Sequence, residues 1–479
     1  MVRRHRLGRK RGRKRIHGLF DVENVGHLVG GKNQKTITLF AQAKVIDVVG
    51  LGEIGPKAGR NHLNYRRRNY HFAKYRGPVI RSIAHRERRL LANRTCTRQT
   101  RRVLIGLFPE LDAPGGVQRA GRHLAAVMTE FAASRGLECR ILSLNDKAEL
   151  KRLNVTGREI VFTGSERAKG NFLAAALKSA RRAAGKGKKA PKIVVAGHPN
   201  LAPVVRAMRL VTPRMKAILC THGVEVWQPL PRMRRNALCK ADVVLAPSKY
   251  TADHVAADQG VDTAKIRVLP WALDPQFEAL ATKASKTPPP AKFPQGHVVL
   301  TVGRWRADER YKGMDTLITA LPRLLPRWPE LQLVAVGDGD DRAWLEDLAE
   351  ETGVDRHVHF LQGLNYEELA ACYGHCEMFA LPSRGEGFGL VYLEAMACGK
   401  PVIGGAHGGA PEVIEDGKTG YLVPHGDAAQ LAIAMETLLA DATLREEMGR
   451  RGKQRVENEF RFNVFSKSFR KILRELCES

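Results

Sequence analysis

Residues 386–401 of the 479-residue chain read EGFGLVYLEAMACGKP and form its most informative segment. The preceding segment, Met378 to Pro382, is apolar and predicts a strand. Leu390 to Ala397 has the composition of a helix, which Gly399 and Pro401 end. A strand, a glycine-rich turn and a helix therefore follow one another, and this is the unit from which parallel α/β sheets are built.

Two carboxylates flank the turn. Glu386 lies at the corner between strand and helix, and Glu394 follows about two helical turns later. Gly387 and Gly389 allow backbone N–H groups to approach an anion closely at the N-terminus of the helix, where the helix dipole favours negative charge. The turn therefore predicts a phosphate site.

Glu394 is expected to lie along the buried face of this helix, where its charge needs a partner. A carboxylate buried along the helix is costly unless a polar ligand or a cation meets it. Acidic residues in dinucleotide-binding folds accept hydrogen bonds from ribose hydroxyls, which offers one such ligand. The alternative is an amphipathic surface helix with two solvated glutamates, because short glycine-rich matches are frequent by chance.

Further motifs occur in a fixed order around this segment. They are Val302-Gly303-Arg304, Lys312-Gly313, Val336-Gly337-Asp338-Gly339, Pro382-Ser383, Gly408-Gly409-Ala410-Pro411-Glu412-Val413-Ile414, Asp416-Gly417 and Thr419-Gly420. Together with the two spaced glutamates, they resemble the retaining nucleotide-sugar glycosyltransferases of family 4. That resemblance implies an α/β protein of the GT-B class, with two facing Rossmann-like domains that each contain a parallel sheet.

The resemblance implies roles for single residues. Arg304 and Lys312 would contact the donor diphosphate, together with the backbone from Gly387 through Phe388 and Gly389 to Leu390 at the helix end. Glu394 would bind the ribose hydroxyls of the nucleotide, and Glu386 the hydroxyls of the donor sugar. The alternative to diphosphate binding by Arg304 is that its side chain is a solvated surface cation without a ligand.

In the first half of the chain, His222 follows an apolar segment, and family members often have a histidine facing the donor sugar in such a place. A lone histidine after a strand is more often structural. Gly115 and Gly116 match the glycine loop of the family near the phosphates and the acceptor. Glu225 and Trp227 are expected to hold the His222 loop. Residues 270–274 read PWALD where the family usually has PNGVD, which puts the contact at the interdomain hinge in doubt.

No metal and no cofactor are expected beyond the nucleotide-sugar, which is a substrate. Asp338-Gly339-Asp340 spells the Asp-x-Asp pattern with which other glycosyltransferases hold Mn²⁺ or Mg²⁺, but the loop resembles the Gly-Asp-Gly turn of the family instead. A Rossmann dehydrogenase would need Gly-x-Gly-x-x-Gly after the first strand, and the glycines from Gly106 to Gly116 do not fit.

From Arg102 onward, apolar strand-like and helical segments alternate, which predicts parallel sheets with helices on both faces. The expected strands are 103–108, 193–196, 217–220, 241–246, 297–303, 331–336, 357–362, 377–382, 401–405 and 420–424. Lys283–Phe293 is expected to be an extended linker, Thr443 and Glu446 to form a capping box, and Asn463–Cys477 to be a helix that returns to the first domain. The predicted parts are 1–100 (extension), 101–280 (acceptor domain), 281–295 (linker), 296–460 (donor domain) and 461–479 (returning helix).

The formal net charge is +30, and the segment before Arg102 is rich in Lys and Arg with few acidic residues. We expect a disordered basic arm or a translated upstream segment there. Such an arm allows peripheral contact with an anionic membrane, whereas nucleic acid is not expected, since no recognised binding motif accompanies the charge. No apolar run reaches the ~18 residues of a spanning helix, and the eight cysteines have no paired spacing. We therefore expect a cytoplasmic protein, peripheral at most to the inner face of the membrane.

These observations predict a retaining, metal-independent glycosyltransferase of the hexosyl type that uses a nucleotide-sugar donor and an unidentified acceptor, which could be a glycan, a lipid-linked molecule or a small molecule. The alternative is a basic nucleic-acid- or membrane-binding protein on an inactive GT-B scaffold. Hydrolysis of a donor would separate the two.

Overall fold

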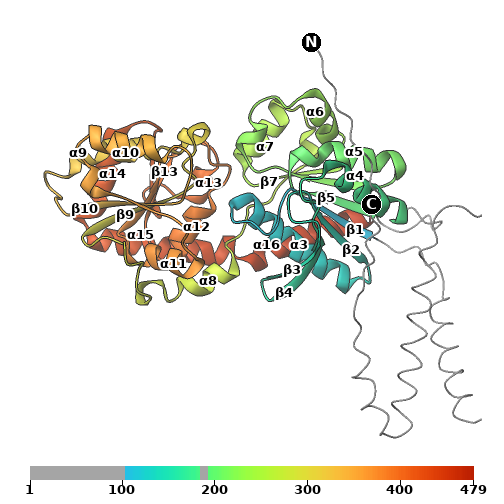
Figure 1. Cartoon of the computed structure of the whole chain (residues 1–479), viewed down its shortest axis with the longest axis horizontal. Helices are drawn as coiled ribbons and strands as arrows, with labels where there is room; N and C mark the ends of the chain where they lie inside the picture. The colour runs from blue at the N-terminus through green and yellow to red at the C-terminus, as the bar shows by residue number, and fades with distance from the viewer. Residues whose placement is uncertain (1–102, 184–191, 479) are drawn as a thin grey trace, which may run out of the picture. The chain divides into compact units, whose positions relative to one another are not determined.

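The computed structural model describes residues 103–183 and 192–478, which form two β-sheets with helices around them (Figure 1). The predicted α/β class with two sheets is confirmed, and both sheets are parallel except for the pair β3–β4. The predicted extension, residues 1–100, lies outside the described residues, and the predicted boundaries of the domains stay a prediction.

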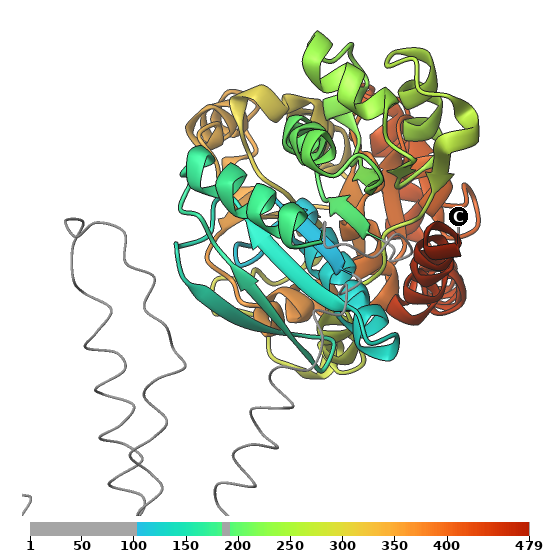
Figure 2. The same ribbon diagram turned by 90° about the vertical axis from the view of Figure 1, so that its right-hand side faces the viewer.

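In the described part of the chain, the first sheet has the strand order β3-β4-β2-β1-β5-β6-β7-β8. Its strands are β1 (Val103–Phe108), β2 (Glu138–Ser143), β3 (Leu150–Val155), β4 (Arg158–Thr163), β5 (Lys192–Ala196), β6 (Lys216–Cys220), β7 (Val243–Ala246) and β8 (Ile266–Val268). The pair β3–β4 is antiparallel and forms one edge of the sheet, in teal in Figure 2. The other pairs described in this sheet are parallel.

Helices connect the strands of the first sheet. They are α3 (Gly116–Ser134), α4 (Lys169–Ala183), α5 (Ala202–Val211), α6 (Arg232–Cys239) and α7 (Lys249–Ala257). Helix α3 is the first helix after β1, and its buried face includes Leu124, Met128 and Phe131. Helix α7 begins after Ser248, whose side chain accepts a hydrogen bond from the backbone N–H of Thr251.

The second sheet has the order β11-β10-β9-β12-β13-β14, and all its described pairs are parallel. Its strands are β9 (His297–Val302), β10 (Leu331–Val336), β11 (Val358–Leu361), β12 (Met378–Leu381), β13 (Val402–Gly405) and β14 (Gly420–Val423). The accompanying helices are α8 (Pro275–Ala281), α9 (Met314–Leu324), α10 (Arg342–Glu351), α11 (Tyr366–His375), α12 (Leu390–Ala397), α13 (Ala410–Val413), α14 (Ala428–Ala440) and α15 (Ala442–Arg455).

Three local expectations differ from the structure. Helix α15 begins at Ala442, before Thr443, because Asp441 accepts a hydrogen bond from the N–H of Leu444 at 2.9 Å and caps the helix. Residues 284–286 of the expected extended linker form a 3₁₀ turn, and Ala284 is buried against Gly374 of α11. The strands β2, β3, β4 and β8 were not predicted.

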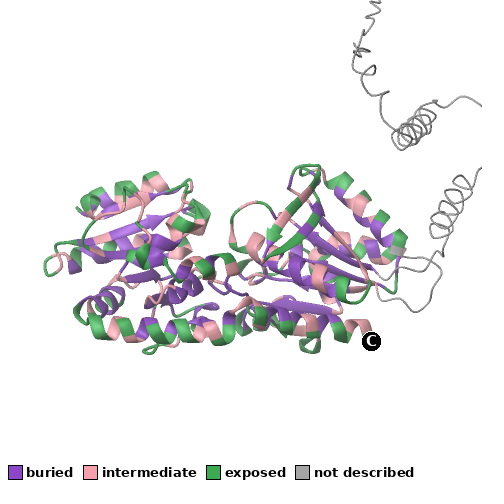
Figure 3. Cartoon of the chain, turned by 90° about the horizontal axis from the view of Figure 1, so that it is seen from below, coloured by how far each residue is buried: buried purple, intermediate pink, exposed green. Residues whose placement is uncertain are grey.

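Helix α16 (Phe462–Glu478) returns to the first sheet, as predicted, and packs against α3 and β5. Its buried side chains include Phe465, Phe469 and Leu473. They belong to an apolar core that also contains residues of β1, α8 and α12, so one core serves both sheets. Figure 3 shows buried strands in purple beneath helices whose outer faces are green. Among the described residues, no helix has the length and apolar character needed to cross a membrane.

Candidate active site

The turn between β12 and α12 ends at the predicted start of the helix, Leu390, whereas β12 ends at Leu381, one residue before the predicted end of the strand. A Cβ atom at Gly387 would lie 1.7 Å from the carbonyl oxygen of His222, so that only glycine fits where the backbone of the first sheet's β6 loop approaches. The hydroxyl of Ser248 donates to the carbonyl of Gly387 at 2.8 Å. The glycine turn therefore receives two contacts from loops at the carboxyl ends of first-sheet strands.

Glu386 is half-buried at this turn. Its backbone carbonyl accepts a hydrogen bond from Gly409 N–H at 2.7 Å, and its carboxylate makes no hydrogen bond or ion pair with another described residue. Burial, then the nearby carboxylates of Glu309 and Glu386, raises the pKa of Tyr311. The Glu386 carboxylate therefore has acceptor capacity left for a ligand next to the loop that contains Tyr311.

That loop carries the two predicted phosphate-binding cations. Arg304 Nη2 lies 2.5 Å from Glu309 Oε1, and Lys312 Nζ lies 3.3 Å from Glu309 Oε2. The side chain of Arg304 is 68% exposed, whereas that of Lys312 is 14% exposed. Both cations therefore share one carboxylate, which an entering anion could replace.

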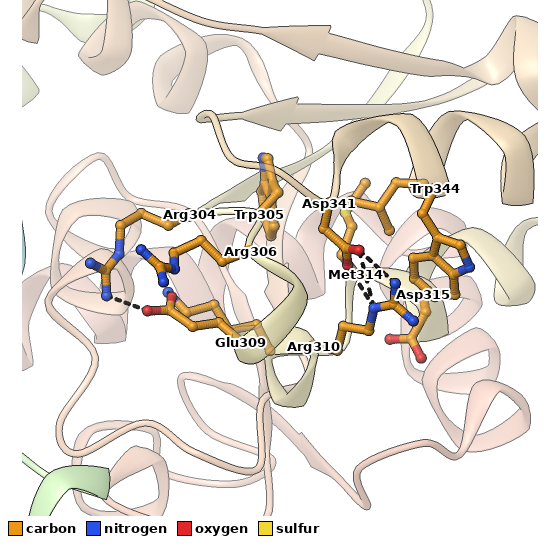
Figure 4. A pocket seen from close by; sticks show the side chains of 11 residues that line it. Arg304, Trp305, Arg306, Glu309, Arg310, Met314, Asp315, Asp341 and Trp344 are labelled. Atoms are coloured by element: carbon orange, nitrogen blue, oxygen red, sulfur yellow. Dashed lines mark hydrogen bonds and ion pairs between the residues drawn. The ribbon is translucent and has the colours of Figure 1, made fainter. Parts of the chain in front are cut away.

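A small pocket lies beside this loop, and its lining shows how the loop is anchored (Figure 4). The guanidinium of Arg310 stacks on Trp344, 3.6 Å from the ring centroid, and binds both oxygens of Asp341. Trp305 is buried beneath the loop. The backbone N–H of Arg384 donates to Tyr311 O at 2.9 Å, which joins this loop to the segment that leads into the glycine turn.

Glu394 is met by a cation from the first half of the chain. Its side chain is 1% exposed, and one oxygen pairs with the guanidinium of Arg119 in α3. The hydroxyl of Tyr373 in α11 donates to the other oxygen at 3.0 Å. Burial by itself would lower the pKa of Arg119, but Glu394 and Tyr366 outweigh it and raise that pKa above its ordinary value. The carboxylate predicted to bind ribose is therefore covered by protein groups in this structure.

The glycine loop before α3 lies close to this pair. Gly115 has a φ of 136°, which favours glycine, and a Cβ at Gly116 would lie 3.8 Å from Leu390 at the start of α12. Phe388 is buried, and its ring meets that of Phe460 at 5.7 Å. The side chain of Phe388 therefore serves the core, and its backbone is what remains for a ligand.

His222 follows β6, and its loop is held as expected. The backbone N–H of His222 donates to Glu225 Oε1 at 2.6 Å. Trp227 lies near Gly408, where a Cβ would be 3.1 Å from the indole ring. Because Gly387 touches the carbonyl of His222, the structure brings this predicted residue to the same turn as Glu386.

The aspartates of the Asp-x-Asp pattern brace loops. Asp338 Oδ1 accepts from Gly339 N–H at 2.8 Å, and Asp340 Oδ1 accepts from Ala307 N–H at 3.1 Å. In the part of the chain that the structure describes, no cluster of three His, Cys, Asp or Glu residues has the geometry of a metal site. Activity without a metal stays a prediction.

Comparison with known proteins places this site in a family. A family model described as Glycosyl transferases group 1 matches residues 284–455, and one described as Glycosyltransferase Family 4 matches residues 114–277. A GDP-mannose-dependent monoacylated alpha-(1-6)-phosphatidylinositol monomannoside mannosyltransferase of Corynebacterium glutamicum is 33% identical over 269 residues, which cover 54% of this chain and 70% of the relative. The chain belongs to glycosyltransferase family 4.

Two further relatives of this family 4 chain differ in coverage. The GDP-mannose-dependent alpha-(1-6)-phosphatidylinositol monomannoside mannosyltransferase of Mycolicibacterium smegmatis is 38% identical over 256 residues, covering 50% of this chain and 64% of the relative. A D-inositol 3-phosphate glycosyltransferase of Corynebacterium jeikeium is 33% identical over 248 residues, covering 49% and 58%. In these two matches the chain spans less than two thirds of the relative's length.

Solved structures confirm the GT-B fold of this family 4 glycosyltransferase. Sucrose-phosphate synthase from Thermosynechococcus elongatus superposes with a TM-score of 0.63 at 23% identity, covering 78% of this chain and 99% of that one. A glycosyltransferase from Rickettsia africae superposes with a TM-score of 0.60 at 18% identity, covering 78% and 98%. At these identities the likeness concerns the fold alone.

Sequence reasoning missed two residues at the site of this family 4 enzyme. Glu309 is close in sequence to both cations, so the pattern Arg304–Glu309–Lys312 could have indicated a shared carboxylate. Arg119 is 275 residues from its partner Glu394. Its only local signal is its position in the first turn of a helix that follows a glycine loop, and that signal does not reveal a partner.

Proposed function

We propose that this family 4 chain transfers a hexosyl group from a nucleoside-diphosphate sugar to an acceptor hydroxyl, with retention of the anomeric configuration. The observation that carries the proposal is the pair of cations, Arg304 and Lys312, on a loop hydrogen-bonded to the segment before Glu386. Positive charge on that loop and the N-terminus of α12 would stabilise a leaving diphosphate. These groups can do so without a metal ion.

The chemistry needs little from acid–base residues. In a front-face displacement, the acceptor oxygen forms its bond to the anomeric carbon on the face from which the diphosphate leaves. The bond between that carbon and the phosphate oxygen breaks, and the same phosphate oxygen takes the acceptor's proton. Glu386 would accept hydrogen bonds from hydroxyls of the donor sugar, and His222 would lie on the other side of the turn.

Glu394 would bind the ribose through the acceptor positions that Arg119 and Tyr373 leave free. A carboxylate has about four lone-pair sites, and two are used here. Because the side chain is 1% exposed, α3 would have to move relative to α12 when the nucleotide binds.

The names of the relatives suggest the substrates. Those from M. smegmatis and C. glutamicum are described as GDP-mannose-dependent phosphatidylinositol monomannoside mannosyltransferases, and that from C. jeikeium as a D-inositol 3-phosphate glycosyltransferase. We infer GDP-mannose as the donor and an acceptor that contains inositol. A lipid acceptor would bring the protein to a membrane surface, where peripheral contact with anionic lipids would suffice.

The experiment screens GDP-, UDP- and ADP-sugars by thermal shift, because a ligand at 100 times its Kd adds ~2.7 kcal/mol of stability. Transfer is then measured to phosphatidylinositol monomannoside and, in parallel, to D-inositol 3-phosphate, with the product's anomeric configuration read by NMR. EDTA should leave turnover intact. Transfer with inversion, or loss of turnover that Mn²⁺ restores, would contradict the mechanism.

The alternative, a binding protein on an inactive scaffold, is not favoured. The relatives are described as enzymes, and Arg304, Lys312 and Glu386 are all present on adjoining loops. Absence of both transfer and donor hydrolysis with every donor tested would revive it.

A further inference from the structure

Trp271 stands where the sequence departs from the family pattern, in the connection between β8 and α8. Its side chain is buried, with 4% exposed. On one side its ring meets His222, with centroids 5.4 Å apart and planes at 30°. On another side it meets Phe465 of α16 at 6.1 Å. A large aromatic ring therefore links the connection between the sheets to the predicted catalytic histidine.

The imidazole of His222 has a second ring neighbour. The ring of His198 lies 5.6 Å away at an interplanar angle of 20°, so His222 makes stacked contacts with both His198 and Trp271. Burial, with smaller effects of His222 and Arg234, lowers the pKa of His198 to about 3, which keeps that ring neutral at pH 7. Two flat neighbours limit rotation of the His222 ring.

The edge of the ring is also fixed. Nε2 of His222 lies 2.7 Å from the carbonyl oxygen of Gly197. A carbonyl can only accept, so Nε2 must carry a proton in this contact. In the neutral imidazole, Nδ1 is then unprotonated and is the ring atom left to accept a hydrogen bond.

The place of this ring relative to the turn is set by the backbone. The carbonyl of His222 contacts Gly387, the residue after Glu386. His222 follows a strand of the first sheet and Glu386 follows a strand of the second, so two hydrogen-bond acceptors from different sheets lie at the same turn. Sugar hydroxyls can donate to both.

We propose that Trp271 is a positioning residue, which together with His198 clamps the imidazole of His222 so that Nδ1 is presented as an acceptor to a hydroxyl of the donor sugar. The proposal rests on the proposed function, in which His222 faces that sugar. If Trp271 served only to fill the core, its loss would lower stability and leave the chemistry of His222 unchanged.

The first experiment is a double-mutant cycle on turnover with Trp271→Leu and His222→Ala. Trp271→Leu should lower kcat about 10- to 100-fold, because misplacing a reacting contact by about 1 Å costs that much. Affinity for the nucleoside diphosphate should not change. In the His222→Ala background, Trp271→Leu should have no further effect on kcat, and two losses that multiply would overturn the proposal.

Phe465→Leu is the matched control, since it removes a buried ring that contacts Trp271. It should lower the Tm while kcat stays within about twofold. An equal loss of kcat in Phe465→Leu and Trp271→Leu would mean that general packing, and not the clamp, sets turnover. Trp271→Phe, which keeps a ring, should recover most of the lost kcat.

The second experiment needs neither substrate nor a disruptive variant. Long-range ¹⁵N–¹H NMR of the histidine rings should show His222 of the full chain with its proton on Nε2, in the wild type and in Trp271→Phe. A proton on Nδ1 in the wild type would overturn the proposal. If the wild type turned over no donor at all, the proposed function would fail, whereas the NMR result would still decide the orientation of the ring.

Discussion

The carboxylates of Glu309 and Glu394 each have cationic or hydroxyl partners, and the two clusters differ in burial. Glu309 serves Arg304 and Lys312 on one loop, and the Arg304 side chain is 68% exposed. Glu394 serves Arg119 and Tyr373 from two other helices, and its side chain is 1% exposed. The Glu309 and Lys312 side chains are 12% and 14% exposed, so the first cluster opens to water at Arg304, where its carboxylate can be exchanged for another anion. The second cluster must satisfy its charge within the protein.

The difference in burial predicts how much stability is lost when each ion pair is broken. Exposed ion pairs contribute about 0–1 kcal/mol, because water replaces a lost partner. Removing one partner of a buried pair costs about 3–5 kcal/mol, since it leaves an uncompensated charge. We therefore expect substitutions in the exposed cluster to change ligand binding, and those in the buried cluster to change stability as well.

The largest expected effect is that of Glu394→Ala. It strands the guanidinium of Arg119 and the hydroxyl of Tyr373, so the free energy of unfolding in urea should fall by about 3–5 kcal/mol. Binding of donor and of free nucleoside diphosphate should be lost together.

Glu386→Ala is the control for that substitution, because its carboxylate has no partner among the described residues. It should leave unfolding nearly unchanged and lower turnover more than diphosphate affinity. The double variant Arg119→Met with Glu394→Met should be more stable than the two single losses predict together. Additive losses would show that Arg119 and Glu394 do not stabilise each other.

The next effect concerns the exposed cluster. Lys312→Ala and Arg304→Ala should each weaken nucleoside diphosphate binding by about 1.5–3 kcal/mol, which is the contribution of a hydrogen bond to a charged group. The Tm should stay within a degree or two. Calorimetry measures the affinity, and Arg327→Ala removes an equally exposed arginine, paired with Glu436, as the matched control. Equal affinity in all three variants would remove both cations from the site.

Near the buried cluster, His123 of α3 should make stability depend on pH. Its side chain is 1% exposed, and burial lowers its pKa below the ordinary 6.5 although Asp274 lies 3.7 Å away. Below about pH 6.5 the unfolded chain therefore takes up a proton that the folded chain does not. The free energy of unfolding should decrease as the pH is lowered, by up to about 1.4 kcal/mol per pH unit.

Urea unfolding at pH 7.5, 6.5 and 5.5 checks the effect of His123. Other groups also titrate in this range, so the measured quantity is the difference between the wild type and His123→Gln. The variant should lose less stability than the wild type on acidification. Parallel pH profiles would show that His123 is protonated to the same degree in both states.

The smallest effect is that of Glu309→Gln. It removes the anion that competes with a diphosphate for Arg304 and Lys312, so nucleoside diphosphate should bind a few-fold more tightly, equivalent to no more than about 1 kcal/mol. The gain should shrink as salt is raised. Weaker binding would show that Glu309 holds the cations in place for the ligand. Both carboxylates would then have a structural role, and the contrast between the two clusters would be wrong.

Local chemistry determined much of the second sheet. Strand β10 and helix α12 have the predicted bounds, because each is a short apolar or helical run ended by glycine or proline. The Thr443 capping box was wrong for a local reason too, since Asp441 is an equally good cap and lies one residue before the helix. The hairpin β3–β4 was missed because its strands, LKRLNV and REIVFT, each contain two adjacent charged residues and so interrupt the apolar run that predicts a buried strand.

The sequence by itself determined the fold class, the family and the candidate residues Arg304, Lys312, Glu386 and His222, because each belongs to a motif that is contiguous along the chain. It also indicated that a buried Glu394 needs a cation or a polar ligand. Only the tertiary structure decided that the cation is Arg119 and that Trp271 stacks on His222. Such pairs join residues far apart in sequence. They form only when packing of the core brings the two side chains together and excludes water from both.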